Sequence, residues 1–427
     1  MFCFTTPTQI RKLADRYKNI ILSSQWSPLI SFFTYFLLGE KSVSDFARHN
    51  PGSKSVSTLS RFIEDFDGNR WMRRLRESVL KKYLKKYKEL DLNNFCFAID
   101  DTNNPKFGKS YRTGSWHGSK GLYNGQRIVV LALVDMVRDF AIPLGFKFAT
   151  KKGISDYVPC YDFCLELLEE VKNSGFPLLQ TVFDSWFDSS DFITKVRSLG
   201  FQVVWEMKSS RTAQVNPNPF SRWIKITTAF KNMTRYRLRS NLESKAIKNY
   251  KRKAPCGSMR KLKIKGLSQQ INCVAMFNRH NGRTAFGYWC ATDLALQADN
   301  IWMLSRARWR IEKLFREVKQ LLSFGRLPSG SKEAAELSVC LPFILYTSLL
   351  LEPELWGRQE DQTIGDVIQS IRNQLLMSSI SKLVHDKSDA IKIRLLARIR
   401  KDRVNKKPVN QTADGRGGTL HLERRAL

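Results

Sequence analysis

The sequence lacks an apolar run long enough to cross a bilayer. The longest runs, Ser27 to Leu38 and Leu337 to Leu351, fall short of the roughly 20 residues that a spanning helix needs, and Pro342 interrupts the second. The N-terminus has basic residues but no apolar stretch followed by a small-residue cleavage site. We therefore expect two core helices, no membrane partner and a cytoplasmic protein.

Cysteine and histidine are too scattered to suggest a zinc site. Of the 8 cysteines, only Cys160 and Cys164 lie close together, and they sit inside an apolar helical pattern. This spacing does not match that of Cys/His zinc sites. We expect reduced, buried thiols, and none of the 5 histidines lies near a candidate Ser or Cys nucleophile.

Acidic residues are scarce. The 427 residues include 39 acidic and 71 basic side chains, which gives a net charge of +32. A content of 42% hydrophobic and 11% aromatic residues excludes a disordered basic tail, because such a chain can bury a core. The length predicts two or three domains.

The excess positive charge is concentrated in three segments. Residues 1–90 hold 17 basic and 8 acidic side chains, residues 209–290 hold 18 and 1, and residues 382–427 hold 13 and 5. The rest of the chain holds 23 and 25. A nearly neutral body therefore carries three basic appendages.

The segment 209–290 is basic enough to indicate a polyanionic partner. Its lysines and arginines alternate with aromatic residues such as Trp223 and Tyr236, as on many phosphate-contacting surfaces. No basic amphipathic helix with an aromatic anchor favours a membrane surface. Nucleic acid is the expected partner.

From Phe95 onward the pattern predicts an α/β domain. Short apolar runs that end at turn residues predict strands, and apolar residues at helical spacing predict helices. Strands are expected at 95–99, 127–137, 141–149, 178–183 and 201–207, and helices at 157–173 and 190–199. The order β-β-β-α-β-α-β predicts a mixed sheet with an antiparallel start.

The following segments predict a β-rich insertion and two long helices. Strands at 271–277 and 284–290 flank Asn281-Gly282, a pair typical of hairpin turns. Long helices are expected at 300–322 and 334–351.

The two ends of the chain differ from this body. Residues 1–90 predict several helices, two of them starting at Ser42 and Ser57, consistent with a small helical DNA-binding unit. The tail from Lys401 is expected to be disordered.

Three carboxylates are placed where they can share a site. Asp100 and Asp184 each directly follow an apolar strand, at the carboxyl edge of the predicted sheet. Glu312 lies on the predicted helix 300–322. The polar side chains within roughly 40° of one another on that helix are Ser305, Arg308, Glu312, Arg316 and Lys319. The helix is expected to pack on the sheet and direct these groups into one cleft.

Such a set of groups suits phosphoryl transfer. Three carboxylates can hold two Mg²⁺ ions about 3.5 to 4 Å apart, and Mn²⁺ can substitute for Mg²⁺. Arg308 and Lys319 would hold flanking phosphates. In the alternative, Glu312 pairs with Arg308 and Arg316 on a solvated helix face, and each aspartate singly caps a turn.

Asp101 makes the first aspartate ambiguous. In a strand only one of two adjacent side chains faces the cleft, and we choose Asp100 because it directly ends the predicted strand. The residues Phe107-Gly108-Lys109-Ser110 resemble the end of a phosphate loop, but Asn103 holds the place of its first glycine. We expect Lys106 and Lys109 to contact DNA backbone instead, with Arg112, Lys120 and Arg127.

Three acidic motifs follow one another along the chain. They are Asp-Asp-Thr at 100–102, Phe-Asp-Ser-Trp-Phe at 183–187, and Arg-Trp-Arg-Ile-Glu at 308–312 with Lys319 seven residues on. Over roughly residues 95–351 this set resembles the bacterial insertion-sequence DDE transposases, in the insertion sequence four-like group with a Tyr-Arg-Glu-Lys signature. The resemblance implies an RNase H-like catalytic domain with a β-rich insertion, which cuts and rejoins DNA at transposon ends with two Mg²⁺ ions.

By position, the resemblance implies that Asp100, Asp184 and Glu312 are the metal ligands. Ser305 stands where the group has its signature tyrosine, which removes an aromatic phosphate contact. Trp309 is expected either to stack on a base near the cleaved end or to be buried. The DNA-contacting set is expected to be Arg308, Lys319, Arg316, Ser305, Trp309, Lys106 and Lys109.

The expected organisation is a helical DNA-binding region (1–90), an α/β catalytic domain (91–208 and 291–355), a basic β-rich insertion (209–290) and basic C-terminal helices with a tail (356–427). The expected function is binding of terminal inverted repeats, cleavage, and strand transfer to target DNA. The resemblance also implies a homodimer at the synapsed ends and a bacterial, nucleoid-associated protein. A two-metal nuclease without strand transfer, and an inactive DNA-binding remnant, remain the alternatives.

Overall fold

The computed structural model divides the chain into two compact units. One comprises Met1–Asp65, Leu321–Leu327 and Ser348–Leu427, and the other comprises Phe66–Gln320 and Pro328–Thr347. The described residues are 8–385 without 41, 51–52, 85–90, 107–110, 119–120, 154–156, 216–220, 240–254, 279–284 and 328–329.

The first unit is helical. Its helices are α1 (Thr8–Asp15), α2 (Trp26–Leu38), α3 (Val43–His49), α4 (Val56–Glu64), α12 (Pro353–Trp356) and α13 (Ile364–His385), with short 3₁₀ turns at Lys18–Ile20 and Ser23–Gln25. Ser42 caps α3, as predicted, by accepting a hydrogen bond from the Asp45 amide. The predicted start of α4 at Ser57 is wrong, because the hydroxyl of Ser55 makes the cap.

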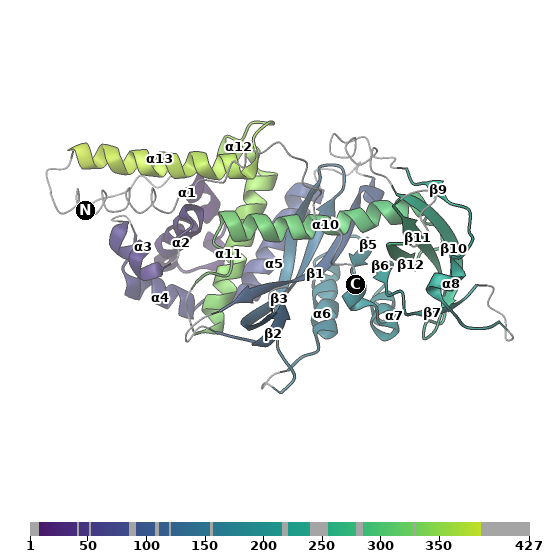
Figure 1. The fold of residues 1–427 in the computed structure, drawn as a ribbon. Coiled ribbons are helices and arrows are strands. Elements are labelled where there is room, and N and C mark those ends of the chain that lie inside the picture. Colours follow the sequence, from purple (N-terminus) through teal and green to yellow (C-terminus); the bar gives the residue numbers. More distant parts are fainter. Residues whose placement is uncertain are drawn as a thin grey trace. The chain divides into compact units, whose positions relative to one another are not determined.

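The second unit is built on a mixed sheet of 12 strands (Figure 1). The strands are β1 (Phe95–Pro105), β2 (Gly114–Gly118), β3 (Gly121–Asp135), β4 (Phe140–Ala149), β5 (Gln180–Phe183), β6 (Val203–Met207), β7 (Thr212–Gln214), β8 (Ile224–Lys225), β9 (Tyr236–Arg237), β10 (Cys256–Ile264), β11 (Gln270–Phe277) and β12 (Gly287–Ala291). Their order is β2-β3-β1-β5-β6-β12-β11-β10-β7-β8, with β4 on β3 and β9 on β10. Strands β1, β5 and β6 are parallel neighbours, and the other pairs are antiparallel.

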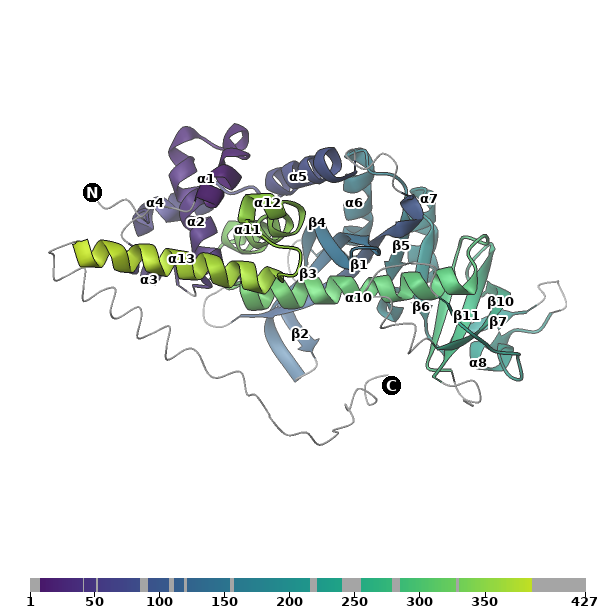
Figure 2. The same cartoon turned by 90° about the horizontal axis from the view of Figure 1, so that it is seen from above.

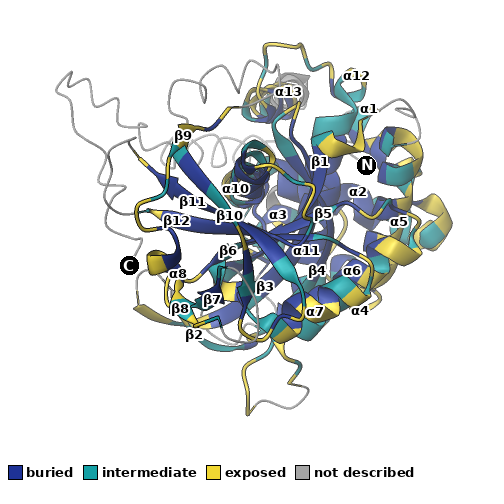
Figure 3. Ribbon diagram, turned by 90° about the vertical axis from the view of Figure 1, so that its right-hand side faces the viewer, coloured by how far each residue is buried: buried dark blue, intermediate teal, exposed yellow. Residues whose placement is uncertain are grey.

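Helices cover both faces of this sheet. They are α5 (Gly68–Val79), α6 (Cys160–Asn173), α7 (Ser190–Ser198), α8 (Ile226–Ala229), α10 (Ala298–Leu321) and α11 (Lys332–Leu351), with short turns at Leu80–Leu84, Leu92–Asn94 and Ser185–Phe187. Figure 2 shows α6 and α7 on one side of β1, β5 and β6, and α10 running along the other side. The central strands lie between these layers and are almost wholly buried (Figure 3). The mixed α/β class is as predicted.

The predicted order of elements from Phe95 is confirmed, with β2 as an addition. β11 and β12 pair antiparallel as expected for a hairpin, although β12 begins at Gly287 and not at residue 284. The predicted turn at Asn281-Gly282 and the tail from Lys401 lie outside the described residues.

The predicted end of the first strand at Ile99 is wrong. β1 continues to Pro105 because it stays paired with β3 through Pro105↔Gly125, long after its parallel partner β5 has ended. The last β1–β5 pair is Ala98↔Val182. Asp100 therefore lies within β1, just past the point where one of its two neighbouring strands stops.

The apolar helix α11 is a core element. By length and composition it could cross a bilayer, but 83% of its apolar window is buried within the fold. Phe343 of α11 packs edge-on against Phe146 of β4, with ring centroids 6.1 Å apart. The seven cysteines in the described part of the chain are free thiols, and five of them are buried as predicted, whereas Cys160 and Cys256 are only half-buried.

Candidate active site

Two of the three predicted carboxylates lie at the same level of neighbouring parallel strands. Val182 pairs with Ala98, so Asp184 and Asp100 each stand two residues beyond a paired position. Because parallel strands lie about 4.8 Å apart, this register brings the two carboxylates together at the carboxyl edge of the sheet. The negative charge of Asp184 contributes to the raised pKa of Asp100, after the larger effect of burial.

Arg308 of α10 connects this edge to the third carboxylate. Its guanidinium donates to Asp100 Oδ2 at 2.9 Å and lies 2.9 Å from Glu312 Oε1. It also interacts electrostatically with Asp184. The predicted packing of this helix on the sheet is therefore confirmed. The solvated-face alternative is met in part, because Glu312 makes its i,i+4 pair with Arg308 and its side chain is 39% exposed. It fails in part, because Arg308 is buried against Asp100 and no pair between Glu312 and Arg316 occurs in the described part of the chain.

Burial governs the titration of these groups. The pKa of Asp100 is raised to about 7, chiefly by burial and to a smaller extent by Asp184 and Asp101, against the opposing effect of Arg308. Burial likewise raises the pKa of Asp184, again opposed by Arg308. Burial disfavours the charged form of Arg308, but Asp100, Glu312 and the other carboxylates together raise its pKa. Positive charge near this cluster, such as that of Arg308, therefore favours the ionised form of the aspartates.

Lys319 lies on the same side of β1 as Arg308. Its ammonium donates to Thr102 Oγ1 at 2.5 Å and to the Asn103 carbonyl at 2.8 Å. Burial lowers its pKa to about 8. These two hydrogen bonds hold the ammonium group of Lys319 against β1, close to the part of the strand that carries Asp100.

Asp101 points away from this cluster. It accepts two hydrogen bonds from Arg127, from Nε at 2.8 Å and from Nη2 at 2.9 Å. Alternation along β1 puts Asp100 and Thr102 toward α10 and puts Asp101 on the opposite face. The choice of Asp100 over Asp101 agrees with this geometry. The argument that Asp100 directly ends the strand is wrong, because β1 continues to Pro105.

The other predicted DNA contacts have mixed surroundings. Ser305 is buried, with 4% exposure, and donates to the Trp302 carbonyl. Lys106 is buried as well, and burial lowers its pKa to about 8. This burial argues against both as direct DNA contacts. Arg316 and Trp309 are exposed, while Lys109 lies outside the described residues.

Glu206 is a fourth carboxylate of the cluster, and the sequence pattern did not single it out. Phe183 pairs with Trp205, so Glu206 of β6 continues the row formed by Asp100 and Asp184. Burial raises its pKa, Arg308 lowers it and Asp184 raises it. The sequence does contain a signal for it, because Glu206 is the one acidic residue of the predicted strand 201–207. Its place beside Asp184, however, depends on the pairing register of β5 and β6, which the sequence pattern does not give.

The donor chemistry of the cluster fits a hard divalent cation. All four carboxylates offer oxygen ligands, and burial raises the pKa values of Asp100, Asp184 and Glu206. Within the described ranges, no three acidic, histidine or cysteine side chains converge closely enough to hold one ion as arranged. The Arg308 guanidinium bonds to both Asp100 and Glu312, and it supplies the neutralising charge there.

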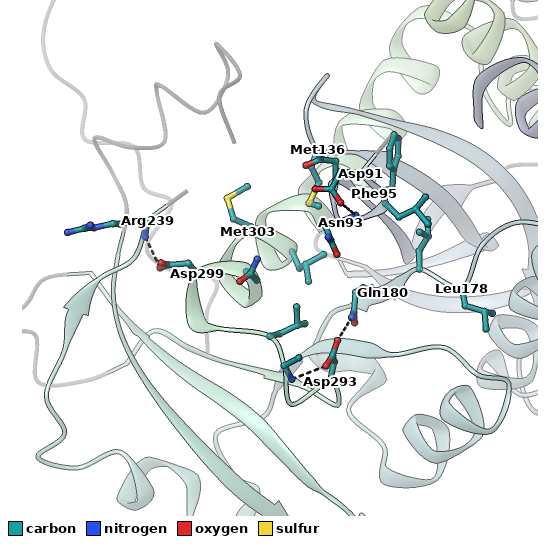
Figure 4. A pocket seen from close by; sticks show the side chains of 17 residues that line it. Asp91, Asn93, Phe95, Met136, Leu178, Gln180, Arg239, Asp293, Asp299 and Met303 are labelled. Atoms are coloured by element: carbon teal, nitrogen blue, oxygen red, sulfur yellow. Dashed lines mark hydrogen bonds between the residues drawn. The ribbon is translucent and has the colours of Figure 1, made fainter. Parts of the chain in front are cut away.

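A separate cavity of about 560 Å³ lies at the opposite end of the strands (Figure 4). It is lined by residues just before or at the start of β1 and β5, such as Asn93 and Gln180, and by the start of α10. Asp293 accepts from Gln180, and Asp299 accepts from the Arg239 amide. None of the predicted site residues lines this cavity, so it is not the cleft of the carboxylates.

The solved structures that resemble this chain include two transposase complexes of low overall likeness. A cryo-EM structure of the piggyBac transposase synaptic complex with hairpin DNA has a TM-score of 0.43 and 10% identity, over 95% of this chain and 82% of that one. The Drosophila P element transposase strand transfer complex has a TM-score of 0.25 and 10% identity, over 94% and 96%. Scores below 0.5 do not establish a shared fold. The comparison with curated proteins gave no match.

Comparison with family models identifies the catalytic region. Residues 98–348 match the model of the transposase DDE domain. The match covers more than half of the chain and includes Asp100, Asp184 and Glu312 with the strands and helix that carry them. DDE transposases cleave and transfer nucleic acid with the help of divalent metal ions. The chain therefore belongs to the DDE transposase family.

Proposed function

We propose that this chain is the transposase of a bacterial insertion sequence of the insertion sequence four-like group. It binds the terminal inverted repeats of its element, cleaves DNA there, and joins the freed 3′-hydroxyl to target DNA. The observation that carries this proposal is the meeting of Asp100, Asp184 and Glu312 around one buried arginine, Arg308. The core strands β1, β5 and β6 would form an RNase H-like catalytic domain.

The carboxylates would hold the metal ions, which we propose to be two Mg²⁺. When bound, such ions activate the attacking water or 3′-hydroxyl and stabilise the leaving oxygen. Asp100 and Asp184 are held rigidly by adjacent strands, and Glu312 is brought to them by α10. Arg308 keeps these like charges together until the site is loaded.

The cationic side chains would bind and orient the DNA backbone. Lys319, fixed by Thr102 and Asn103, is placed to contact a phosphate beside Asp100. The exposed Arg316 continues the cationic surface along α10. The basic segments 1–90 and 209–290 would hold the element's ends, and two chains would act together at the synapsed ends in the bacterial cytoplasm.

Strand transfer is favoured over the two alternatives by the family match, which spans all three acidic motifs. A nuclease without strand transfer needs the same carboxylates, so only the product separates it from a transposase. An inactive remnant has no need to retain three acids around one arginine.

The test uses the purified full-length chain, Mg²⁺, and DNA that carries the inverted repeats flanking its coding region together with a target plasmid. We expect cleavage at the repeat ends and a joined product, and neither with Asp184→Asn. Cleavage without joining would support the nuclease. Equal cleavage by wild type and Asp184→Asn would contradict the catalytic role of the cluster.

A further inference from the structure

Trp186 is a large aromatic side chain that is exposed directly beside the catalytic edge. It lies two residues after Asp184, and its indole is 37% exposed. Its backbone amide donates to Asp184 Oδ1 at 2.9 Å, within the 3₁₀ turn Ser185–Phe187. An exposed tryptophan presents a large apolar surface to solvent. Its position beside the candidate carboxylates therefore suggests that a ligand contacts it.

The indole of Trp186 is held in one orientation by its neighbours. The Arg127 guanidinium carbon lies 4.5 Å from its ring centroid. Phe187 packs edge-on at 4.8 Å, and Tyr161 of α6 lies 5.7 Å away and donates its hydroxyl to the Trp186 carbonyl. Few conformations remain to be lost when a ligand binds to the open face of the ring.

The three residues that contact the Trp186 indole, Arg127, Tyr161 and Phe187, form a clamp on it. Arg127 anchors this clamp in the sheet. Arg127 of β3 makes its two hydrogen bonds to Asp101, and the ring of Trp116 lies 5.5 Å from the guanidinium on another side. The two-point bond fixes the plane of the guanidinium. Burial alone would lower the pKa of Arg127, but the hydrogen bonds and charge of Asp101 raise it. The charge that faces the indole is therefore permanent.

We propose that Trp186 is a stacking platform for an unpaired base of the bound DNA, next to the catalytic carboxylates. Asp101 and Arg127 are positioning residues, which act through the orientation of the indole. This inference rests on the proposed function, since it requires that DNA occupies the site.

A nucleobase suits this surface better than a phosphate does. The exposed group is an aromatic ring, and the charged guanidinium of Arg127 already donates two hydrogen bonds to Asp101. A base within an intact duplex is covered by its neighbours on both sides, whereas an unpaired base offers a free face to the ring. Base stacking on an aromatic side chain depends little on sequence, so the platform needs no recognition of a particular base.

The experiment compares two fluorescent DNAs, an intact duplex of generic sequence and the same duplex with a short unpaired stretch. The full-length chain is titrated with each, and the ratio of the two dissociation constants is the readout. We expect wild type to prefer the unpaired DNA, and Trp186→Leu to lose that preference by roughly ten-fold. Trp186→Phe keeps an aromatic face and should keep most of the preference.

Leu178→Ala is the control, because Leu178 is also a large exposed apolar side chain, at 54%, and lies beside the cavity at the opposite end of the strands. It should leave the ratio unchanged. Arg127→Gln should reduce the ratio partly, by releasing the indole while leaving its ring intact. Thermal unfolding of each variant identifies any that has lost its fold.

The outcomes separate the platform from the proposed function. If wild type binds both DNAs and folded Trp186→Leu keeps the wild-type ratio, the platform is overturned and DNA binding stands. If folded wild type binds neither DNA, the proposed function fails and the platform fails with it. Equal loss of the preference in Trp186→Leu and Trp186→Phe would also contradict stacking.

Discussion

The two faces of β1 hold different kinds of side chain. On the face toward α10, Asp100 and Thr102 hydrogen-bond with Arg308 and Lys319 in a largely buried cluster. On the opposite face, Asp101 meets Arg127, which leads outward to the exposed Trp186. One strand thus separates a buried ionic cluster from a more open aromatic one.

This difference shows how adjacent aspartates acquire different roles. Asp100 is buried near other carboxylates, and burial first and the charge of Asp184 second raise its pKa. Asp101 is already satisfied by a two-point bond with Arg127. A carboxylate whose partner is a fixed guanidinium is suited to holding a neighbour in place, and less suited to binding a metal.

The largest expected effect concerns this pair directly. Asp100→Asn should lower the rate of end cleavage at least about a thousand-fold, since roughly 4 kcal/mol of transition-state stabilisation depends on a metal ligand. Asp101→Asn should lower the same cleavage rate by roughly 10- to 100-fold, as expected for a group that supports metal ligands without binding the metal itself. Single-turnover cleavage of end DNA in Mg²⁺ measures both, and a larger loss in Asp101→Asn would reverse the assignment.

The next effect tests whether the row of carboxylates extends to β6. Glu206 shares the register of Asp184 and interacts with Arg308. Glu206→Gln should reduce cleavage by roughly 10- to 100-fold and weaken Mn²⁺ binding to the DNA-free chain, because outer groups tune metal affinity by such factors. Glu166→Gln, a surface change on α6, is the control. Unchanged Mn²⁺ affinity in Glu206→Gln would show that Glu206 does not contribute to metal binding, which would leave Asp100, Asp184 and Glu312 as the candidate ligands.

The smallest effect is a pH dependence of DNA binding. Burial lowers the pKa of Lys319 to about 8, so below that pH its ammonium is already charged and binding a phosphate requires no proton. Above it, binding requires proton uptake, so affinity should fall by up to roughly ten-fold per pH unit. Lys319→Arg should remove the part of this slope that Lys319 contributes, because arginine stays protonated.

Lys106 provides the matched control for this slope. Burial lowers its pKa to about 8 as well, but it has almost no surface for a phosphate to reach. Lys106→Arg should keep the wild-type slope in binding titrations over the same pH range. If Lys319→Arg keeps that slope too, Lys319 does not contact DNA through its charge.

Sequence patterns predicted the strands β1, β3 to β6, β11 and β12, the helix α10 and the three candidate carboxylates, because each depends on local periodicity or on a motif. The strands β2 and β7 to β10 were not predicted. The length of β1 was not predictable from the apolar run, since pairing with β3 extends it through polar residues. Glu206 and the clamp on Trp186 depend on register and on contacts between distant segments. The burial of Ser305 and Lys106 likewise results from packing that periodicity alone does not show.

The most direct test of the division between the two faces of β1 is anomalous diffraction from crystals of the full-length chain soaked in Mn²⁺. We predict Mn²⁺ peaks on the α10 face, in contact with Asp100 and Asp184, with Arg308 moved from its position between Asp100 and Glu312. The bond between Asp101 and Arg127 should stay intact. A Mn²⁺ ion bound to Asp101, with Asp100 still paired to Arg308, would contradict the account.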